Sequence, residues 1–316
     1  MAKEIINEST DTERIKEILR KVRRIDITTR HKAGEMLSGH YRSVFKGRGI
    51  EFSEVRDYVF GDSIKQIEWN VTARMGKPYI KQFVEERELN IILALDVSPS
   101  MYFGSFPVST GDGETASRHF KIDTASEIIA TLSVSASMNN DKIGLILYDN
   151  AIRKYIPQKK TRDQSMRIIR EVMGYRPVSA VADLQNTLRY IMSVQKKRGV
   201  LFVISDFEPL DDYKEIPTAK RRFDLVPVII IDRRETELGN HGFLNIYDPE
   251  SGEDLVIDSS SRRVRNAYRK VAEEKISRKR MVFKKNGIDF IEIYTHTDYI
   301  PGLVRFFRMR EHRFSL

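Results

Sequence analysis

Residues 90–101, NIILALDVSPSM, indicate the fold class of this chain. An unbroken apolar run that ends in a carboxylate, here Asp96, is typical of a strand buried on both faces of a parallel sheet. Runs of the same kind recur further along the chain and also end in Asp: KIGLILYD (142–149), GVLFVISD (199–206) and DLVPVIIID (224–232). The repetition predicts several parallel strands in one sheet.

Segments with helical spacing separate these runs, and GIDFIEIYT (287–295) and residues 299–312 add a further strand and a closing helix. Alternating strands and helices predict an α/β fold with a doubly wound, mostly parallel sheet of the Rossmann type. In such sheets ligands bind at the carboxyl ends of the strands, at a topological switch point. We therefore expect a functional site at the edge that carries Asp96, Asp149, Asp206 and Asp232.

The chain before this domain has a different character. Ile15, Ile18 and Leu19 have the spacing of one helix face, and glycines punctuate short apolar segments between residues 40 and 90. The sequence predicts three parts: an N-terminal helical segment (1–35), an appended β-rich element (36–89) and the α/β domain (90–316). Within the last part, the Ser- and Gly-rich residues 102–118 are predicted to form an exposed loop.

Composition excludes several kinds of protein. The 316 residues are 41% hydrophobic and include no cysteine, which excludes disulfides, thiolate nucleophiles and thiolate metal sites. The first residues are charged throughout, and no apolar stretch is long enough to span a membrane. We expect a cytoplasmic protein with no membrane span.

The net charge of +9 is concentrated near the end of the chain. The segment RRVRNAYRKVAEEKISRKRMVFKKNG (262–287) has helical spacing and a basic outer face. It is interpreted as a solvated face or as a docking surface for an acidic protein. A nucleic-acid-binding protein that uses the basic helix 262–285 is an alternative, but no zinc-finger or RNA-binding signature accompanies the charge, so nucleic acid is disfavoured.

The most informative short motif is Asp96-Val-Ser98-Pro-Ser100. In an extended stretch alternate side chains point the same way, so one carboxylate and two hydroxyls face a common point. These are hard ligands suited to Mg²⁺, and equally to Mn²⁺ or Ca²⁺, with Asp206 as the predicted second carboxylate. The alternative is a Ser/Pro loop in which the hydroxyls only satisfy backbone groups.

These residues resemble known families. Asp96-x-Ser98-x-Ser100 followed by Met101 resembles the metal-ion-dependent adhesion site (MIDAS) of von Willebrand factor A domains. Residues 47–90 resemble the signature of the bacterial domain-of-unknown-function fifty-eight (DUF58) family, whose members carry a von Willebrand A-like domain. The matching elements are Gly49, Glu51-Phe52, Arg56-x-Tyr58, Gly61-Asp62, Ile67-x-Trp69, Ala73-Arg74 and Glu86-Arg87.

The resemblance implies a non-enzymatic, metal-binding protein-interaction module. Members of the family are commonly encoded beside MoxR-type AAA+ ATPases and are thought to act with them as adaptors or chaperone-like proteins. In adhesion sites of this type, an acidic side chain of a partner or client fills an open position on the metal. The resemblance therefore implies a metal set of Asp96, Ser98, Ser100 and Asp206.

One position departs from the family pattern. Where an adhesion site usually has Thr, in the loop before the helix that precedes ISDF (204–207), this chain has Ala182. Asp183 is a candidate to approach the metal instead, directly or through water, whereas Thr187 falls one helical turn too late. The change predicts a site that is weakened, rearranged or metal-free.

An enzyme is the other class to consider. A Mg²⁺-dependent phosphohydrolase with Asp96 as nucleophile is chemically sound, but such enzymes usually carry a second Asp where Ser98 stands. The chain also has no G-x-x-x-x-G-K-[ST] phosphate loop. In the 47–90 block we expect structural roles, with Trp69 in a core and Arg56 tying a loop to a carboxylate.

Overall fold

The computed structural model describes residues 51–64, 67–84, 89–105, 119–177, 181–208, 214–247 and 254–314. The chain divides into two compact units, one of residues 45–89 and one of residues 1–44 with 90–316. The predicted N-terminal helical segment and most of the predicted 102–118 loop lie outside the described residues. The two units are described in turn.

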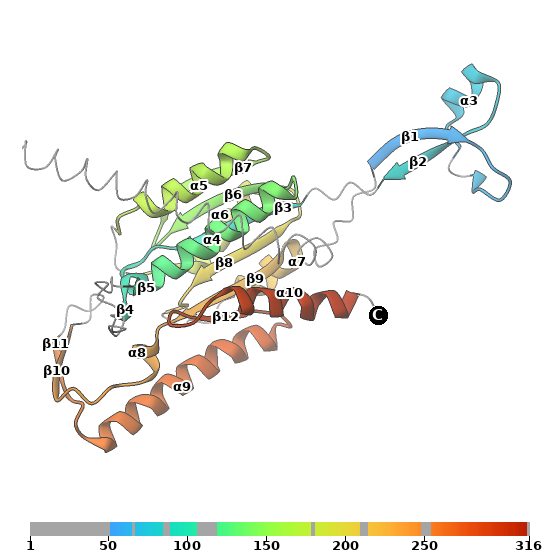
Figure 1. Ribbon diagram of the computed structural model, residues 1–316. Coiled ribbons are helices and arrows are strands. Elements are labelled where there is room, and N and C mark those ends of the chain that lie inside the picture. Colours follow the sequence, from blue (N-terminus) through green and yellow to red (C-terminus); the bar gives the residue numbers. More distant parts are fainter. Residues whose placement is uncertain are drawn as a thin grey trace, which may run out of the picture. The chain divides into compact units, whose positions relative to one another are not determined.

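The larger unit is built on a six-stranded sheet (Figure 1). Its strand order is β12 (Ile291–Tyr294), β9 (Asp224–Ile231), β8 (Val200–Ser205), β3 (Asn90–Asp96), β6 (Lys142–Tyr148) and β7 (Ile152–Lys159). Every neighbouring pair is parallel except β6 and β7. The predicted α/β fold with a mostly parallel sheet is therefore confirmed.

The antiparallel edge strand β7 is absent from the sequence-based prediction. Its sequence, IRKYIPQK, alternates between half-buried and exposed positions, and only Ile156 is buried. An edge strand has one neighbour and a partly solvated face, so it lacks the continuous apolar run that marks the central strands.

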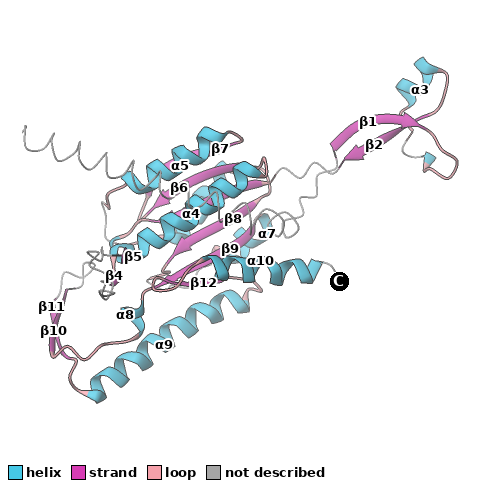
Figure 2. Ribbon diagram, viewed as in Figure 1, coloured by secondary structure: helices cyan, strands magenta, loops and turns pink. Residues whose placement is uncertain are grey.

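Helices cover both faces of the sheet (Figure 2). On one face, α4 (Lys121–Met138) and α5 (Arg162–Gly174) pack through Ala130 and Ile169, and α10 (Ile300–Phe314) places Gly302 against Ile293 of β12. The other face is covered by α6 (Leu184–Val194), α7 (Ile216–Arg222) and α9 (Arg262–Lys285). This two-sided burial explains why the central strands are apolar throughout.

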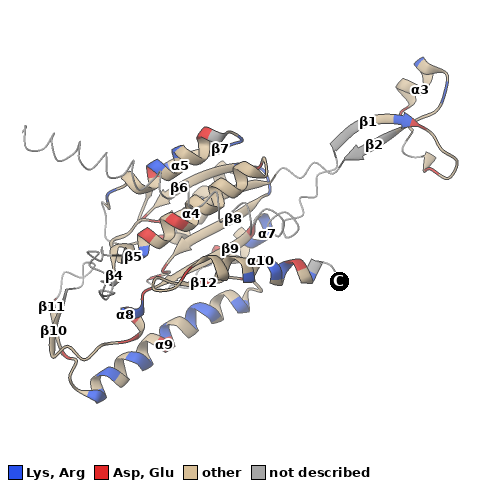
Figure 3. Cartoon of the chain, in the orientation of Figure 1, with Lys and Arg blue, Asp and Glu red and all other residues tan. Residues whose placement is uncertain are grey.

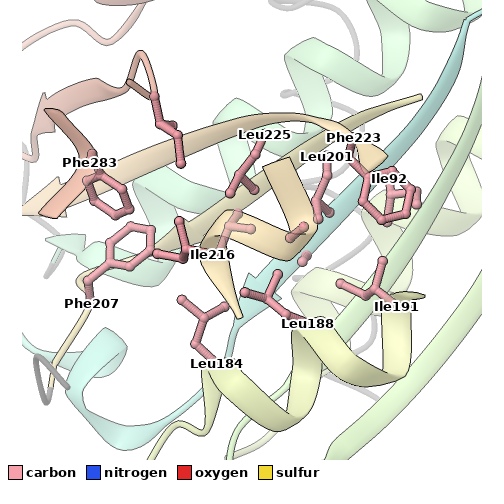
Figure 4. Packing of buried hydrophobic residues seen from close by; sticks show 14 of the residues in the cluster. Ile92, Leu184, Leu188, Ile191, Leu201, Phe207, Ile216, Phe223, Leu225 and Phe283 are labelled. Atoms are coloured by element: carbon pink, nitrogen blue, oxygen red, sulfur yellow. The ribbon is translucent and has the colours of Figure 1, made fainter. Parts of the chain in front are cut away.

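Figure 4 shows the core on the second of these faces, where side chains of α6, α7 and α9 meet the strands. Leu184, Leu188 and Ile191 recur at helical spacing along α6 and are all buried. Phe207, just after β8, meets Phe283 of α9 edge to face with 5.1 Å between ring centroids. The contact fixes the loop after β8 against the long basic helix.

Gly199 shows how closely the chain packs at the start of β8. A Cβ added there would lie 2.1 Å from the carbonyl oxygen of Asn90. Gly199→Ala is therefore expected to lower the free energy of unfolding by about 2 kcal/mol, because the clash is with rigid backbone. Urea denaturation measures this loss. Gly174→Ala is the matched control, since nothing lies within 4 Å of its added Cβ; equal losses in the two variants would contradict the prediction.

The smaller unit pairs β1 (Glu51–Asp57) antiparallel with β2 (Tyr79–Val84) and carries the helix α3 (Trp69–Met75). Gly76 ends α3 with a φ of 69°, a left-handed conformation that favours glycine. Both guanidinium NH2 groups of Arg56 donate to the Asp62 carboxylate at 2.8 Å, and they hold the turn that follows β1. The prediction that Arg56 ties a loop to a carboxylate is confirmed.

The prediction that Trp69 lies in a core is wrong. Trp69 begins α3 and is 64% exposed, and no residue of that helix is buried. A seven-residue helix over a two-stranded ribbon offers too little apolar surface to enclose an indole ring. Phe60 in the preceding turn is also exposed, at 99%.

The remaining elements are short. They are the 3-10 helix η2 (Pro99–Tyr102), the two-residue pair β4 (Gly104–Ser105) and β5 (His119–Phe120), the helix α8 (Arg233–Thr236), and the hairpin of β10 (Phe243–Tyr247) and β11 (Asp254–Asp258). Among the helices described, none combines the length and the apolar character needed to cross a membrane.

Candidate metal centre at the carboxyl edge of the sheet

The two predicted carboxylate ligands, Asp96 and Asp206, lie at the ends of neighbouring strands in the centre of the sheet. Asp96 is the last residue of β3, and Asp206 directly follows β8, the strand that pairs with β3 in parallel. The chain crosses from β3 to β6 on one side and later to β8 on the other, so the strand order reverses between β3 and β8. This is the switch point at which α/β sheets bind ligands.

Ser98 and Ser100 reach the same place because the chain turns sharply after β3. Pro99 begins the short helix η2, and the Ser98 amide before it donates to Asp96 Oδ1 at 2.9 Å. The two hydroxyl oxygens lie 3.1 Å apart, and the Ser100 hydroxyl also hydrogen-bonds the Asp206 carboxylate. The structure thus brings together Asp96, Ser98, Ser100 and Asp206, as the sequence predicts.

Ser205 is a member of the site that the sequence analysis did not assign. Its hydroxyl donates to Asp96 Oδ2 at 2.6 Å and accepts from the Phe207 amide at 2.8 Å. Phe207 has a φ of 56°, which lies in the left-handed region and turns the chain away from the strand end. The strand-ending Ser205-Asp206 pair was the only signal for this role in the sequence.

Lys121 is the second residue that the sequence analysis missed. It is the first residue of α4, its side chain is 1% exposed, and its ammonium donates to Asp206 Oδ2 at 2.6 Å. The same ammonium pairs with Glu235 of α8. No local pattern around Lys121 announces this contact, because its partners lie far away in the sequence.

Burial and the neighbouring charges shift the pKa values of these acids. Burial, together with the charge of Asp206, raises the pKa of Asp96 from 3.8 to about 7. Burial alone would also raise the pKa of Asp206, but the Lys121 ammonium lowers it below its usual value. The pKa of Glu235 is raised by burial. The two strand-end carboxylates therefore repel each other, and a positive charge between them would stabilise both.

The donor chemistry fits a hard divalent cation. Two carboxylates and two hydroxyls converge, and the carboxylates are close enough for Asp206 to raise the pKa of Asp96. Within the described ranges, no group of three or more His, Cys, Asp or Glu side chains could hold a metal ion. A bound metal would therefore depend on the hydroxyls of Ser98 and Ser100 as much as on Asp96 and Asp206.

The Asp183 side chain is engaged at the start of α6. Its Oδ1 accepts from the Asn186 amide at 2.8 Å, so the carboxylate caps α6. The Thr187 hydroxyl donates to the Asp183 carbonyl at 2.8 Å, so its hydrogen bond stays within the first turn of that helix. A role for Asp183 as a metal ligand stays a prediction. Its neighbour Ala182 offers no oxygen in place of the usual Thr hydroxyl.

The other two strand-end carboxylates have structural partners. The Arg153 side chain contacts both oxygens of Asp149, at 2.7 and 2.8 Å. Asp232 caps α8 through the Arg234 amide and accepts from the Thr295 hydroxyl at 2.6 Å. All four acids lie at the carboxyl ends of strands, but in the described contacts only Asp96 and Asp206 join the serines.

A cavity of about 410 Å³ opens beside the site. The residues that line it include Asn150, Ala182, Asp183, Ser205 and Phe207. The cavity therefore offers space next to Ser205 that a side chain of another molecule could enter.

The basic helix α9 contacts the segment that follows β8. Figure 3 shows Lys and Arg along the length of α9. Some of these side chains form ion pairs with other parts of the domain. Lys279 is 7% exposed and pairs with Glu208 at 2.7 Å, and Arg280 pairs with Glu292 at 2.6 Å. Part of the basic charge thus holds the fold together.

The fold and the site together define the class of this protein as a von Willebrand A-like domain. A mostly parallel six-stranded sheet carries the motif Asp96-x-Ser98-x-Ser100 at the end of a central strand, beside Asp206 of its neighbour. The chain matches the model of the family described as "Protein of unknown function DUF58" over residues 54–278. It belongs to this family.

Comparison with known proteins finds relatives in sequence and neighbours in structure. "Uncharacterized protein Rv1480" of Mycobacterium tuberculosis is 24% identical over 294 residues, covering 92% of this chain and 88% of the relative. The structure of the conserved hypothetical protein BatB from Bacteroides thetaiotaomicron is 12% identical, covering 71% of this chain and 99% of BatB, with a TM-score of 0.44. The SpRpn10 VWA domain is 11% identical over 68% of this chain and 94% of that domain, with a TM-score of 0.35.

Proposed function

We propose that this chain is a metal-ion-dependent protein-interaction module and not an enzyme. A von Willebrand A-like domain of the DUF58 family suggests a protein-interaction module. Metal dependence is proposed because Asp96, Ser98, Ser100 and Asp206 converge at the switch point of the sheet. These four residues would hold Mg²⁺, or Mn²⁺ or Ca²⁺, as the bound cation.

The partner's contribution follows from the chemistry of the site. The site supplies two carboxylates and two hydroxyls but no Thr hydroxyl, because Ala182 stands in that position. A hard cation completes its coordination with further oxygens, so an acidic side chain from a partner or client is a fitting ligand. The cavity beside Ser205 offers room for that side chain.

The family resemblance gives the proposal its cellular context. We propose a cytoplasmic adaptor or co-chaperone that works with a MoxR-type AAA+ ATPase and a client protein with an exposed acidic group. Neither nucleic acid nor a membrane is part of the proposal.

The environment of Asp96 argues against the phosphohydrolase alternative. A nucleophilic carboxylate needs an oxygen that can reach the substrate phosphorus. Both oxygens of Asp96 accept hydrogen bonds, from the Ser98 amide and the Ser205 hydroxyl, and the residue is 0% exposed. These contacts support a role for Asp96 in orienting the serines around the proposed cation.

Calorimetric titration of the metal-stripped protein with Mg²⁺ tests the proposal. We expect saturable binding by the natural chain and its loss in Asp96→Ala, because that substitution removes one of two carboxylates and the acceptor that orients Ser98. The same proteins are then tested for binding to a purified MoxR-type ATPase with and without Mg²⁺.

Asp149→Ala is the control, since Asp149 ends a neighbouring strand but pairs with Arg153. It should keep metal and partner binding as long as it folds. Metal binding that survives in Asp96→Ala, or partner binding that is indifferent both to Mg²⁺ and to Asp96, would contradict the proposed function.

A further inference from the structure

The site already contains a positive charge of its own. The Lys121 ammonium is 1% exposed and lies between two carboxylates, Asp206 at the strand end and Glu235 of α8. A buried ammonium retains its charge only when such partners offset the loss of water. Lys121 is therefore a fixed counter-ion for the carboxylate that the proposed metal would also use.

Competition for Asp206 follows from how its two oxygens are used. Oδ2 accepts from Lys121 at 2.6 Å, and Oδ1 accepts from the Glu208 amide at 3.1 Å. A divalent cation that approaches this carboxylate meets an ammonium within a few ångströms, and in a buried site the two positive charges repel strongly. Asp96, in contrast, has hydrogen-bond donors but no cation bonded to it among the described contacts.

We infer that Lys121 is the affinity-determining residue of the metal centre: its ammonium competes with the divalent cation for Asp206. This inference rests on the proposed function, because it assigns a role toward the same cation. With Lys121 in place, the isolated chain binds the metal weakly. The negative charge of a partner's carboxylate then contributes a larger share of the total binding.

The chain offers a close comparison in Lys279. This lysine is also nearly buried, at 7% exposed, and its charge also acts on Asp206, but its ammonium pairs with Glu208. A general effect of buried positive charge would make the two lysines equivalent. Direct competition for the Asp206 oxygens makes Lys121 the dominant one.

Mg²⁺ titration by calorimetry, with Tb³⁺ luminescence as a second probe of the site, tests the inference. Lys121→Met removes the ammonium and keeps a flexible apolar chain, and we expect it to bind Mg²⁺ about tenfold more tightly or better, by comparison with the 1–3 pKa units through which neighbouring charges shift proton binding. Lys121→Arg keeps the charge and should bind like the natural chain. Lys279→Met should change the affinity clearly less than Lys121→Met does.

A folding control accompanies the titration, because Lys121→Met leaves the buried Asp206 carboxylate and the half-buried Glu235 carboxylate without their shared ammonium. Circular dichroism confirms that each variant is folded, and Lys121→Met combined with Glu235→Gln replaces the single variant if that one unfolds. The double variant lacks both the ammonium and its second carboxylate, so Asp206 is released in either background.

The outcomes separate this inference from the proposed function. If the natural chain binds Mg²⁺ through Asp96 and removal of Lys121 does not tighten binding, the inference is overturned and the proposed function stands. If only the variants that lack the Lys121 ammonium, and not Lys121→Arg, bind Mg²⁺, the inference is supported and metal dependence of the natural chain is withdrawn. Absence of binding in every protein overturns both.

Discussion

Replacing Lys121 with methionine is expected to lower the free energy of unfolding of the metal-free protein by about 3–5 kcal/mol, as is typical when one partner of a buried ion pair is removed. The loss arises because the Asp206 carboxylate would remain buried without the Lys121 ammonium, and the half-buried Glu235 carboxylate would lose the same partner. Chemical denaturation at pH 7 in the presence of a chelator measures it. Adding Mg²⁺ should recover part of the loss in Lys121→Met.

Lys154→Met is the control for this prediction. Lys154 pairs with Glu171 on the surface, where the two side chains are 44% and 34% exposed. Solvent screens such a pair, so its removal should change the stability by at most about 1 kcal/mol. A loss of that small size for Lys121→Met would show that Lys121 is not a buried counter-ion of Asp206.

The stability of the metal-free protein is expected to fall as the pH rises from about 4 to 7. Asp96 has a pKa of about 7 in the folded chain against an ordinary 3.8, so between these values the folded state holds a proton that the unfolded state has released. Raising the pH therefore favours unfolding, by roughly 4 kcal/mol over the whole window. Urea denaturation at a series of pH values, with chelator present, measures the slope.

Neighbouring groups do not reverse this sign. The pKa of Glu235 is also raised, which adds a loss in the same direction. The lowered pKa of Asp206 affects stability only below its ordinary value, outside the window. Asp96→Asn removes the titrating group and should flatten most of the slope. An unchanged slope in Asp96→Asn would assign the pH dependence to other residues.

Much of the fold could be predicted from local patterns. The central strands are apolar throughout because both faces are covered, so β3, β6, β8 and β9 were predicted within a residue of their observed ends. Two predictions failed: the edge strand β7 was not predicted, and Trp69 was expected in a core but is exposed. In both cases the missing information was how much of the surface other elements would cover.

The candidate site divides in the same way. Local spacing was enough to predict that Asp96, Ser98 and Ser100 share a point, because alternate residues after a strand project together. Asp206 could be added because parallel strands end at one edge of the sheet. The contacts of the Lys121 ammonium with Asp206 and with Glu235 of α8 could be found only in the folded chain. The reason is physical: spacing along the chain fixes which neighbours share a face, whereas an ion pair between distant residues depends on where packing places two helices.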